Sequence, residues 1–408
     1  RRVLQLSDHE LVRLTRDKVE VFDSAGLPVD KMETVVSWDI SSAEKGGYAH
    51  FMIKEIMEQP QAISATISPR IGADGGIVLD GIRLTTGELQ KIRRIYMVAC
   101  GSAYHACVVG KYVLEKLTRV PAEADLASEF RYRDPLVDEN TLVIIVSQSG
   151  ETADTLAALR EAKRRGARVL SVVNVVGSTI ANESDDVLYT WAGPEISVAT
   201  TKAYSTQLTM LYLITFYIAE KLGRIDSRDL RRLLSALIHL PDMVSGILRQ
   251  APDIRQLSQR YAYLDHAYFI GRNLDYAVAL EASLKLKEIS YIHSEAYAAG
   301  ELKHGTISLI TEGVPVIALA TQKQVYEKTI SNAKETKSRG AKVLLFTTKD
   351  AVVPEGVADY VVRLDDYDDL LMPLQLIVPL QLFAYYMAVL RGCDVDKPRN
   401  LAKSVTVE

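Results

Sequence analysis

The sequence has few of the groups that form disulfides or bind metal ions. Only three cysteines, Cys100, Cys107 and Cys393, occur in 408 residues, and none belongs to a CxxC pair. We therefore expect small buried thiols in a cytoplasmic, reducing environment rather than a disulfide framework. No group of His and Cys residues has metal-ligand spacing, so we expect no metal site.

Strong charge and long apolar runs are also absent. The net charge is −4 and the charges alternate along the chain, which argues against nucleic acid or a membrane surface as a partner. We find no run of about 18 uncharged apolar residues and expect no transmembrane span. The first residues, Arg1-Arg2-Val3, include no Met and resemble no signal peptide. We expect that they are not the natural N-terminus.

An internal duplication dominates what is present. The run Arg165-Gly166-Ala167-Arg168-Val169-Leu170 resembles Arg339-Gly340-Ala341-Lys342-Val343-Leu344. Upstream, Ile95–Gly101 parallels Ala267–Gly271 at nearly the same offset. Each copy repeats strand and helix patterns, and its strands are continuous Val/Ile/Leu runs, as in parallel sheets covered on both faces.

These patterns predict an α/β protein with two tandem doubly wound parallel-sheet domains. Their expected ranges are 75–235 and 255–395. Residues 1–36 have short β patterns, and 37–70 is an expected connector with a helix from His50 to Met57 that ends near Pro60. An irregular tail, 396–408, completes the chain.

The loop after predicted strand Thr141–Val146 is rich in hydroxyl groups. Its residues are Ser147-Gln148-Ser149-Gly150-Glu151-Thr152, and a helix to Arg165 follows. Free N–H groups at a helix start hold phosphate, and serine and threonine hydroxyls add donors. No Lys follows Gly150, so this is not a nucleotide-triphosphate loop. The loop predicts either a phosphate monoester site or simple helix capping.

In the second copy the matching segment is Ala320-Thr321-Gln322-Lys323, after strand Val314–Ala320 and before helix Gln324–Arg339. Because the serines are missing there, only the first copy is expected to bind phosphate. Ala199-Thr200-Thr201-Lys202 precedes an apolar helix, and it either lines the same pocket or caps that helix.

A predicted helix from Tyr276 to Ile292 carries charges on an apolar side. At about 100° per residue, Glu281, Lys285 and Glu288 share an arc bounded by Leu284 and Ile289, away from the polar side with Ser283 and Lys287. Ionised groups there are costly unless they are paired or used, and a partly desolvated Glu suits a general base. The alternative is a Glu281–Lys285 pair on a solvated face.

Two further candidates lie downstream. His304, between Gly300 and Gly305, is either structural or part of a site with the neighbouring carboxylates. In the tail, Lys403 lies between Ala402 and Ser404. The tail is either a frayed end or places this amine in a pocket as a nucleophile toward a ketone.

Five segments together resemble a known family, the isomerase (double SIS, sugar isomerase) half of glutamine–fructose-6-phosphate aminotransferases, also called glucosamine-6-phosphate synthases. The similarity covers about 38–408. The segments are Cys100-Gly101, Ser147–Thr155, Lys285–His293, Gly300–Gly305 and Lys397–Glu408. Residues 1–36 resemble the end of the family's glutaminase domain, without its N-terminal cysteine, so we expect no glutamine hydrolysis.

The resemblance implies roles for individual residues. Fructose 6-phosphate would be converted to glucosamine 6-phosphate, without a redox or metal cofactor, in a homodimer. Lys403 would form a Schiff base with C2, Glu288 would carry a proton between C1 and C2, Lys285 would assist proton transfer, and His304 would assist ring opening, in its own or the neighbouring subunit. Residues expected to bind the phosphate are Ser147, Gln148, Ser149 and Thr152. Residues expected to line the sugar pocket are Glu195, Val198, Thr200, Glu281 and Ala402.

One position departs from the family. Relatives usually have Gly-Thr-Ser after the first cysteine, whereas this chain has Gly101-Ser102-Ala103. Ala103 lacks a hydroxyl expected to contact the sugar, which predicts weaker affinity. Two other functions remain open at this stage: a non-catalytic SIS sensor of sugar phosphates, and a sugar-phosphate deaminase.

Overall fold

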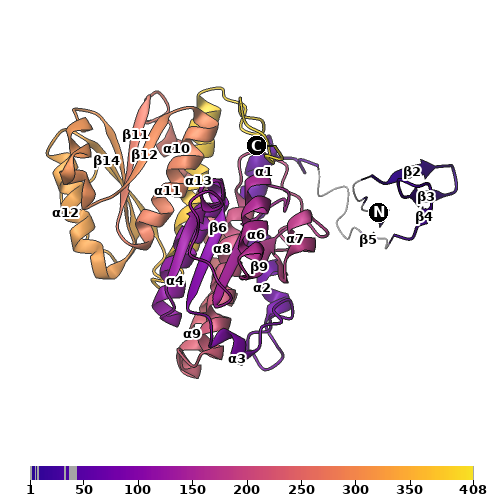
Figure 1. Ribbon diagram of the computed structural model, residues 1–408. Coiled ribbons are helices and arrows are strands. Elements are labelled where there is room, and N and C mark those ends of the chain that lie inside the picture. Colours follow the sequence, from indigo (N-terminus) through magenta and orange to yellow (C-terminus); the bar gives the residue numbers. More distant parts are fainter. Residues whose placement is uncertain (1, 5, 7–8, 32–33, 36–43, 408) are drawn as a thin grey trace. The chain divides into compact units, whose positions relative to one another are not determined.

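The computed structural model describes residues 2–4, 6, 9–31, 34–35 and 44–407. The chain divides into two compact units, Arg1–Glu44 and Lys45–Glu408. Since their mutual placement is not determined, each is described by itself (Figure 1). Part of the predicted connector, 37–43, lies outside the described residues.

The smaller unit consists of short antiparallel strands, which confirms the β pattern predicted for its described residues. Asp23 builds the turn after the second strand of the three-stranded sheet, where its Oδ1 accepts from the N–H groups of Ala25 and Leu27. The strands are β1 (Arg2–Val3) paired with β5 (Thr34–Val35), and β2 (Leu11–Leu14), β3 (Val19–Phe22) and β4 (Pro28–Val29) in one sheet.

The larger unit contains two parallel five-stranded sheets, so the predicted α/β class is confirmed. The first has the order β10-β9-β8-β6-β7 and the second β12-β11-β13-β14-β15. In both, the first strand of the copy lies between the second and the third, so the duplication seen in sequence is also a duplication of topology. The strands are β6 (Arg94–Ala99), β7 (Ala122–Leu126), β8 (Thr141–Ser147), β9 (Arg168–Val173), β10 (Asp186–Tyr189), β11 (His266–Gly271), β12 (His293–Ala298), β13 (Pro315–Ala320), β14 (Lys342–Thr348) and β15 (Tyr360–Leu364).

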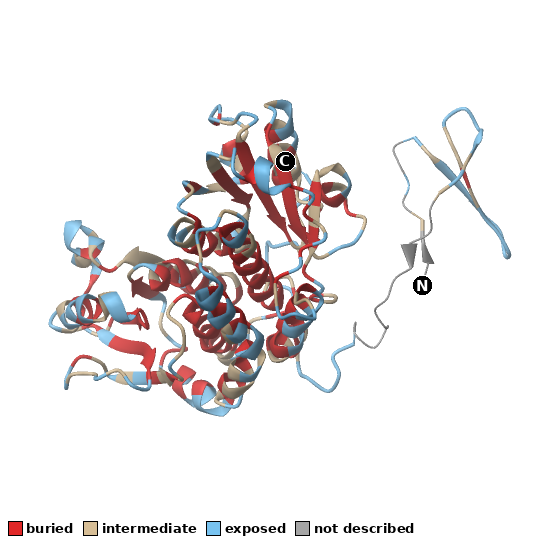
Figure 2. Cartoon of the chain, turned by 90° about the horizontal axis from the view of Figure 1, so that it is seen from below, coloured by how far each residue is buried: buried red, intermediate tan, exposed pale blue. Residues whose placement is uncertain are grey.

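Helices cover both sheets, and those at the centre of the larger unit are mostly buried (Figure 2). The α-helices are α1 (Phe51–Met57), α2 (Gln59–Ile67), α3 (Thr86–Leu89), α4 (Gly101–Thr118), α5 (Ala127–Phe130), α6 (Ala153–Arg164), α7 (Thr179–Glu183), α8 (Lys202–Lys221), α9 (Ser227–Leu248), α10 (Ala251–Ser258), α11 (Leu274–Ser290), α12 (Tyr326–Lys337) and α13 (Met372–Leu390). The 3-10 turns are η2 (Ser68–Arg70), η3 (Glu301–His304), η4 (Thr306–Leu309) and η5 (Lys323–Val325).

Most predicted boundaries agree with the structure to within two residues. Gly166 and Gly340 follow α6 and α12 with positive φ, as predicted for residues that end a helix. The connector helix α1 ends at Met57, near Pro60 as predicted. Pro60 itself lies in the first turn of α2, where a missing N–H costs nothing. Ser283, expected on the polar side of α11, is buried and bonded to Ser294.

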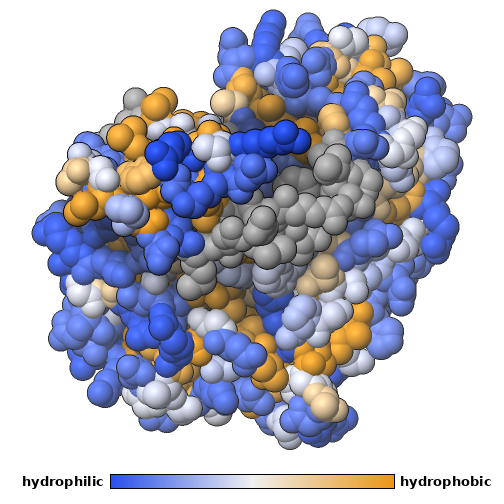
Figure 3. All heavy atoms as spheres, turned by 90° about the vertical axis from the view of Figure 1, so that its right-hand side faces the viewer, coloured by the Kyte–Doolittle hydropathy of each residue, from blue (hydrophilic) through white to orange (hydrophobic). Residues whose placement is uncertain are grey.

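Helix α13 corrects the expectation about apolar runs. Met372–Leu390 contains no charged residue and is long and apolar enough to cross a membrane by length and composition. However, 83% of that window is buried inside the protein, where α13 packs against α9, α10 and α11. The helix therefore forms the centre of the core. On the face shown in Figure 3, hydrophilic and hydrophobic residues are interspersed.

The tail after α13 has no regular structure, as predicted, yet it is fixed. Both carboxylate oxygens of Asp396 accept hydrogen bonds at the start of α1, from Phe51 N and Met52 N, each at 2.9 Å. The Asp396 carbonyl accepts from Val198 N at 2.9 Å. One tail residue thus caps α1 and holds the loop before α8.

We predict that Asp396→Ala lowers the free energy of unfolding by about 1–2 kcal/mol, because two N–H groups at the start of α1 lose their acceptor. Asp396→Asn, which keeps one acceptor oxygen, should lose less. Urea denaturation followed by circular dichroism measures both effects. Equal midpoints for Asp396→Ala and the unmodified chain would contradict the cap.

Candidate active site

The first sheet has a switch point between β6 and β8, its first and third strands. From there the connections lead toward opposite edges of the sheet, which opens a crevice outside the carboxyl ends of these strands, where doubly wound proteins bind ligands. Strand β6 leads into α4 through Cys100, and β8 leads through the Ser147–Thr152 loop into α6. Two helix N-termini, with their partial positive charge, meet at this edge.

The Ser147–Thr152 loop is tightly organised. The Oγ of Ser147 accepts from Gly150 N at 3.0 Å and lies 3.2 Å from Thr152 Oγ1. The Oγ of Ser149 accepts from Glu151 N at 3.2 Å. Several hydroxyl groups are thereby gathered at the start of α6, which is the arrangement that suits a phosphate.

Gly150 is required by this geometry. Its φ is +69°, and a Cβ atom there would lie 2.0 Å from the Oγ of Ser178. Any other residue would force the loop away from α7, whose Thr179 N donates to Glu151 Oε1 at 2.8 Å. The loop therefore needs Gly150 for steric reasons, in addition to the hydroxyl groups that its serines supply.

A cavity of about 100 Å³ lies beside the loop. It receives residues from β8, α4, α6, α8 and the tail. The lining residues are Cys100, Ser102, Ala103, Val146, Ser147, Gln148, Ser149, Thr152, Thr155, Thr200, Gln207 and Lys403. Four predicted phosphate residues, Ala103, Thr200 and the predicted lysine nucleophile thus share one cavity.

The tail packs against the Ser147–Thr152 loop and the start of α6. The Oγ of Ser404 lies 3.0 Å from Ser149 Oγ, and the Val405 carbonyl accepts from Ala153 N at 3.0 Å. Between the tail's anchor at Asp396 and these contacts, Lys403 is directed into the cavity. The frayed-end alternative is therefore wrong for the described part of the tail.

Lys403 is held by two acceptors. Its Nζ lies 2.5 Å from Glu195 Oε2 and 2.8 Å from the Ser197 carbonyl. Glu195 is buried and its other oxygen accepts from Thr201 N and Ala203 N at the start of α8. Burial alone would raise the pKa of Glu195, but the charge and hydrogen bond of Lys403 and these two amides outweigh it and lower that pKa.

A second charged cluster joins the two domains. Fully buried Glu281 of α11 accepts from Ser102 Oγ at 2.8 Å and lies 2.9 Å from His105 Nδ1, both on α4. Burial acts to raise the Glu281 pKa, yet the charge of Lys285 and the hydrogen bond from His105 bring it below its usual range. The solvated-face alternative for Glu281 and Lys285 is therefore wrong.

Lys285 connects this cluster to the predicted base. Its Nζ lies 2.8 Å from Glu288 Oε2, 3.4 Å from Glu281 Oε1 and 3.3 Å from Ser102 Oγ. Burial disfavours the ammonium form, but the two carboxylates dominate and raise the pKa of Lys285. Lys285 is thus a fixed cation, while the Glu288 side chain is 21% exposed and accessible. Ser102, which lines the cavity, is the link between this cluster and the phosphate loop.

The remaining predicted residues lie in different places. Val198 and Ala402 are in the two segments that carry Glu195 and Lys403 but do not line the cavity, and Glu195 lies behind Lys403. His304, in η3, is exposed, and among the described residues no hydrogen bond or ion pair joins it to either cluster. The structure therefore brings all predicted residues but His304 to one region.

Three residues of the site were not predicted from the sequence. They are His105, Ser102 as a partner of Glu281, and Glu55 of α1, which contacts the loop before α8. His105 lies one turn into the helix that follows β6, so its position at the switch point could have been found by following the same topology rule as for Ser147. Glu55 gave no signal, because its contacts are with backbone amides far along the chain.

The second sheet has an equivalent switch point, which is closed. Buried Asp275, at the start of α11, accepts from Thr321 N at 2.7 Å, from Thr321 Oγ1 at 2.5 Å and from Gln322 N at 3.2 Å. Burial raises the pKa of Asp275 to about 6. An internal carboxyl group thus occupies the amides that correspond to those of the Ser147–Thr152 loop.

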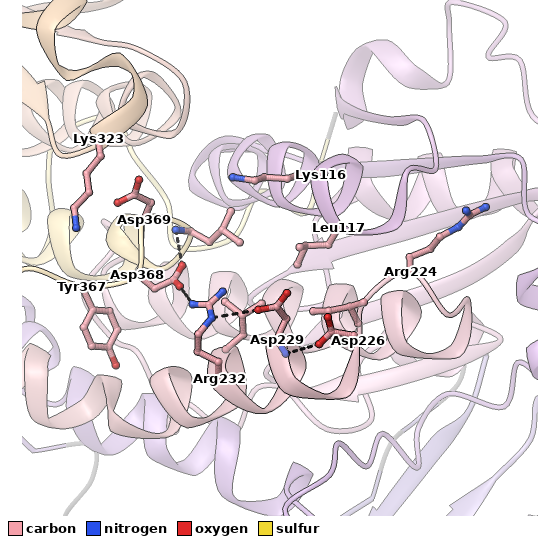
Figure 4. Close-up of a pocket in the computed structure, with 13 residues that line it drawn as sticks. Lys116, Leu117, Arg224, Asp226, Asp229, Arg232, Lys323, Tyr367, Asp368 and Asp369 are labelled. Atoms are coloured by element: carbon pink, nitrogen blue, oxygen red, sulfur yellow. Dashed lines mark hydrogen bonds and ion pairs between the residues drawn. The ribbon is translucent and has the colours of Figure 1, made fainter.

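A wider cavity, of about 590 Å³, lies between the end of α4, the start of α9 and the segments that follow β13 and β15 (Figure 4). Several of its charged side chains are already bonded within the protein. Arg232 pairs with Asp368 and Asp229, and Asp226 caps α9 by accepting from Arg228 N and Asp229 N. It has no cluster of hydroxyl groups at a helix start, so we place the site at the smaller cavity.

Comparison with known proteins defines the class first. The SIS domain family matches the chain twice, at residues 88–216 and 262–391. The C-terminal domain of glucosamine-fructose-6-phosphate aminotransferase from Francisella tularensis superposes with a TM-score of 0.83 at 40% identity, covering 87% of this chain and 100% of that one. The fold is thus that of a double-SIS protein.

Two curated relatives identify the family within this class. The glutamine–fructose-6-phosphate aminotransferase [isomerizing] of Caldanaerobacter subterraneus is 56% identical over 408 residues, and that of Symbiobacterium thermophilum is 54% identical over 409. Each alignment covers all of this chain and 67% of the relative. The chain belongs to the glutamine–fructose-6-phosphate aminotransferase family and corresponds to its C-terminal isomerase part.

We predict that His105→Ala destabilises the protein by roughly 1–3 kcal/mol, since the buried Glu281 carboxylate loses a hydrogen-bond partner. Because the pKa of Glu281 is lowered by folding, its stabilising effect is complete above the ordinary value of 4.5 and is lost as the pH falls through the folded-state value. Unfolding in urea over a pH series measures the difference, which should be largest above that value. A difference that grows with acidification would contradict this assignment.

Proposed function

We propose that this chain converts fructose 6-phosphate and ammonia to glucosamine 6-phosphate and water through a Schiff base on Lys403. The observation that carries the proposal is the position of Lys403, which lines the same cavity as the Ser147–Thr152 loop. The ammonia would come from a glutaminase domain such as the relatives' name implies, outside the isomerase part.

The phosphate end of the sugar would bind first to the loop. Ser147, Ser149 and Thr152 supply hydroxyl donors, Gln148 lines the same wall, and the α6 N-terminus adds its partial charge. Ser404 already contacts Ser149, so occupation of the loop and the position of the tail are coupled. Binding energy from the phosphate would in this way orient the reacting carbons.

The covalent step would use the Lys403 amine. After the Lys403 ammonium gives up a proton, Nζ attacks the C2 carbonyl of the open-chain ketose, a C–N bond forms, and the carbinolamine loses water to give an iminium ion. Ammonia then adds at C2 and releases Lys403 as the free amine, leaving a C2 imine of the sugar. Glu195 is placed to balance the Lys403 charge before the amine forms.

Proton transfer would follow at the neighbouring carbon. The C2 imine acidifies the C1 proton, which the Glu288 carboxylate removes and returns to C2. The proton of the C1 hydroxyl passes to the imine nitrogen, so that C1 becomes the aldehyde and the nitrogen the amine of glucosamine 6-phosphate. Lys285, a buried cation 2.8 Å from Glu288, would stabilise charge on the sugar hydroxyls. Val198, Thr200, Glu281 and Ala402 would border the sugar.

His304 requires a separate explanation. Since it is exposed in η3 and joined to neither cluster in the described chain, we propose that it completes the site of a second copy in a homodimer, where it would assist ring opening.

We predict that borohydride reduction with fructose 6-phosphate gives an adduct on Lys403, and that Lys403→Ala forms none and loses at least about a thousandfold in turnover. Lys397→Ala, which removes an exposed lysine from the same tail, is the matched control and should behave as the unmodified chain. Peptide mass spectrometry locates the adduct. Binding without any adduct or turnover would instead make the protein a sensor.

We predict that Glu288→Gln lowers kcat by about a hundred- to ten-thousandfold with little change in fructose 6-phosphate binding, because the base is lost but the phosphate loop is intact. Steady-state kinetics with ammonia and isothermal titration with the sugar separate the two effects. Unchanged turnover would remove Glu288 as the base.

We predict that Ala103→Ser strengthens binding of fructose 6-phosphate by about two- to tenfold, since a cavity-lining position gains one hydroxyl group. Titration of the sugar into both proteins gives the ratio of dissociation constants. Weaker binding by the serine variant would show that position 103 does not contact the sugar.

A further inference from the structure

Lys403 is held by the loop before α8, and this loop is fixed from behind by a carboxyl group that has no role in the proposed reaction. The Oε1 atom of Glu55, on α1, accepts from Ile196 N at 2.5 Å and from Ser197 N at 3.2 Å. These residues follow Glu195 directly, and the Ser197 carbonyl is one of the two acceptors of Lys403 Nζ. Glu55 therefore fixes the backbone between the two residues that hold the lysine, Glu195 and Ser197.

The other oxygen of Glu55 is unusual. Glu55 is 2% exposed, and its Oε2 is buried without a hydrogen-bond partner in the described structure. A buried carboxyl oxygen without a partner is costly, so a group that served only to hold two amides would be better replaced by a neutral one. That cost points to a function for the second oxygen or for its charge.

We propose that Glu55 is a positioning residue for Lys403, which aligns the Glu195–Ser197 loop through two amides and sets, through its own protonation, how readily the lysine becomes an amine. This proposal rests on the proposed function, because it assigns Glu55 to the step in which Lys403 attacks the ketose. It adds to that function a residue from the connector helix.

The charges near Glu55 support this role. Burial, followed by the negative charge of Glu195, raises the pKa of Glu55 to about 8, and Ile196 N and Lys403 oppose the shift. At neutral pH Glu55 therefore carries a proton, and Lys403 faces one negative charge rather than two. Other titratable groups that α1, α2, α8, α13 and the tail bring near α1 are His50, Lys54, Glu58, Lys202, Tyr385 and Asp396.

The ionisation of Glu55 would lower the reactivity of Lys403. Above the Glu55 transition the pair of carboxylates stabilises the Lys403 ammonium, so less free amine is present to attack C2. Below it, neutral Glu55 leaves Glu195 as the single counter-charge. Glu55→Gln, in which an amide of the same shape cannot ionise, should therefore allow the Lys403 amine to form at lower pH.

The test is the rate of adduct formation on Lys403 with fructose 6-phosphate and cyanoborohydride, over a pH series that spans pH 8. For Glu55→Gln we expect the rising limb of this rate to move to lower pH by roughly half a unit to one unit, which is about three- to tenfold more adduct at a fixed pH on that limb. The amide keeps an acceptor for Ile196 N and Ser197 N.

Two further variants separate alignment from stability. Glu55→Asp keeps a carboxyl group that can ionise but withdraws it from the amides, so we expect about a tenfold slower rate without the shift toward lower pH. Glu58→Gln is the matched control, three residues along the chain from Glu55; it loses ion pairs with Lys202 and Lys54 but makes no bond to the 195–197 loop, and its pH midpoint should not move.

The outcomes are distinguishable. If the unmodified chain forms no adduct at any pH, the Schiff base itself is refuted. If it does, and Glu55→Gln has the same midpoint, or shares its shift with Glu58→Gln, then Glu55 is merely structural and the inference fails. Should Glu55→Gln not fold, a Glu55→Asp protein with an unchanged rate would also overturn the proposed alignment.

Discussion

The contact between Lys403 Nζ and Glu195 Oε2, at 2.5 Å, is the interaction on which the arrangement of this site depends. Lys403 belongs to a segment without regular structure, so its position is fixed only by what it binds and by its two neighbouring anchors. Asp396 on one side caps α1, and Ser404 on the other contacts the serine loop. Loss of the ion pair would release the lysine, whereas loss of an anchor would move it as a whole.

The two domains are tied together by a second set of charges. Glu281, Lys285 and Glu288 on α11 face Ser102 and His105 on α4, so a buried network crosses between the copies of the duplicated fold. Breaking one member would leave an uncompensated buried charge, which is strongly destabilising. The same network places the buried Lys285 cation beside the more exposed Glu288 carboxylate.

Much of this could be predicted from the sequence, for identifiable reasons. Continuous apolar strands and glycine at helix ends are local signals, so the two sheets and the β8–α6 loop followed from pattern alone. Glu281 and Lys285 followed because three-dimensional burial is encoded in helical periodicity. Glu55 and Asp396 could not be found in this way, since their partners lie far away in sequence. The apolar window of α13 was overlooked because glutamine and proline interrupt its hydrophobic run.

The two copies of the duplicated fold differ at their switch points. Both sheets have the same strand order, but Asp275 fills the amides of the second switch point with an internal carboxyl group. In the first copy the corresponding place is a cavity. The second switch point is therefore filled by a side chain of the protein itself, whereas the first is open.

The most direct test of the account is a crystal structure of the chain after reduction with fructose 6-phosphate. We predict a continuous bond from Lys403 Nζ to C2, with the phosphate oxygens on Ser147, Ser149 and Thr152. A phosphate bound elsewhere, or a Lys403 side chain turned to solvent while the sugar occupies the cavity, would contradict it.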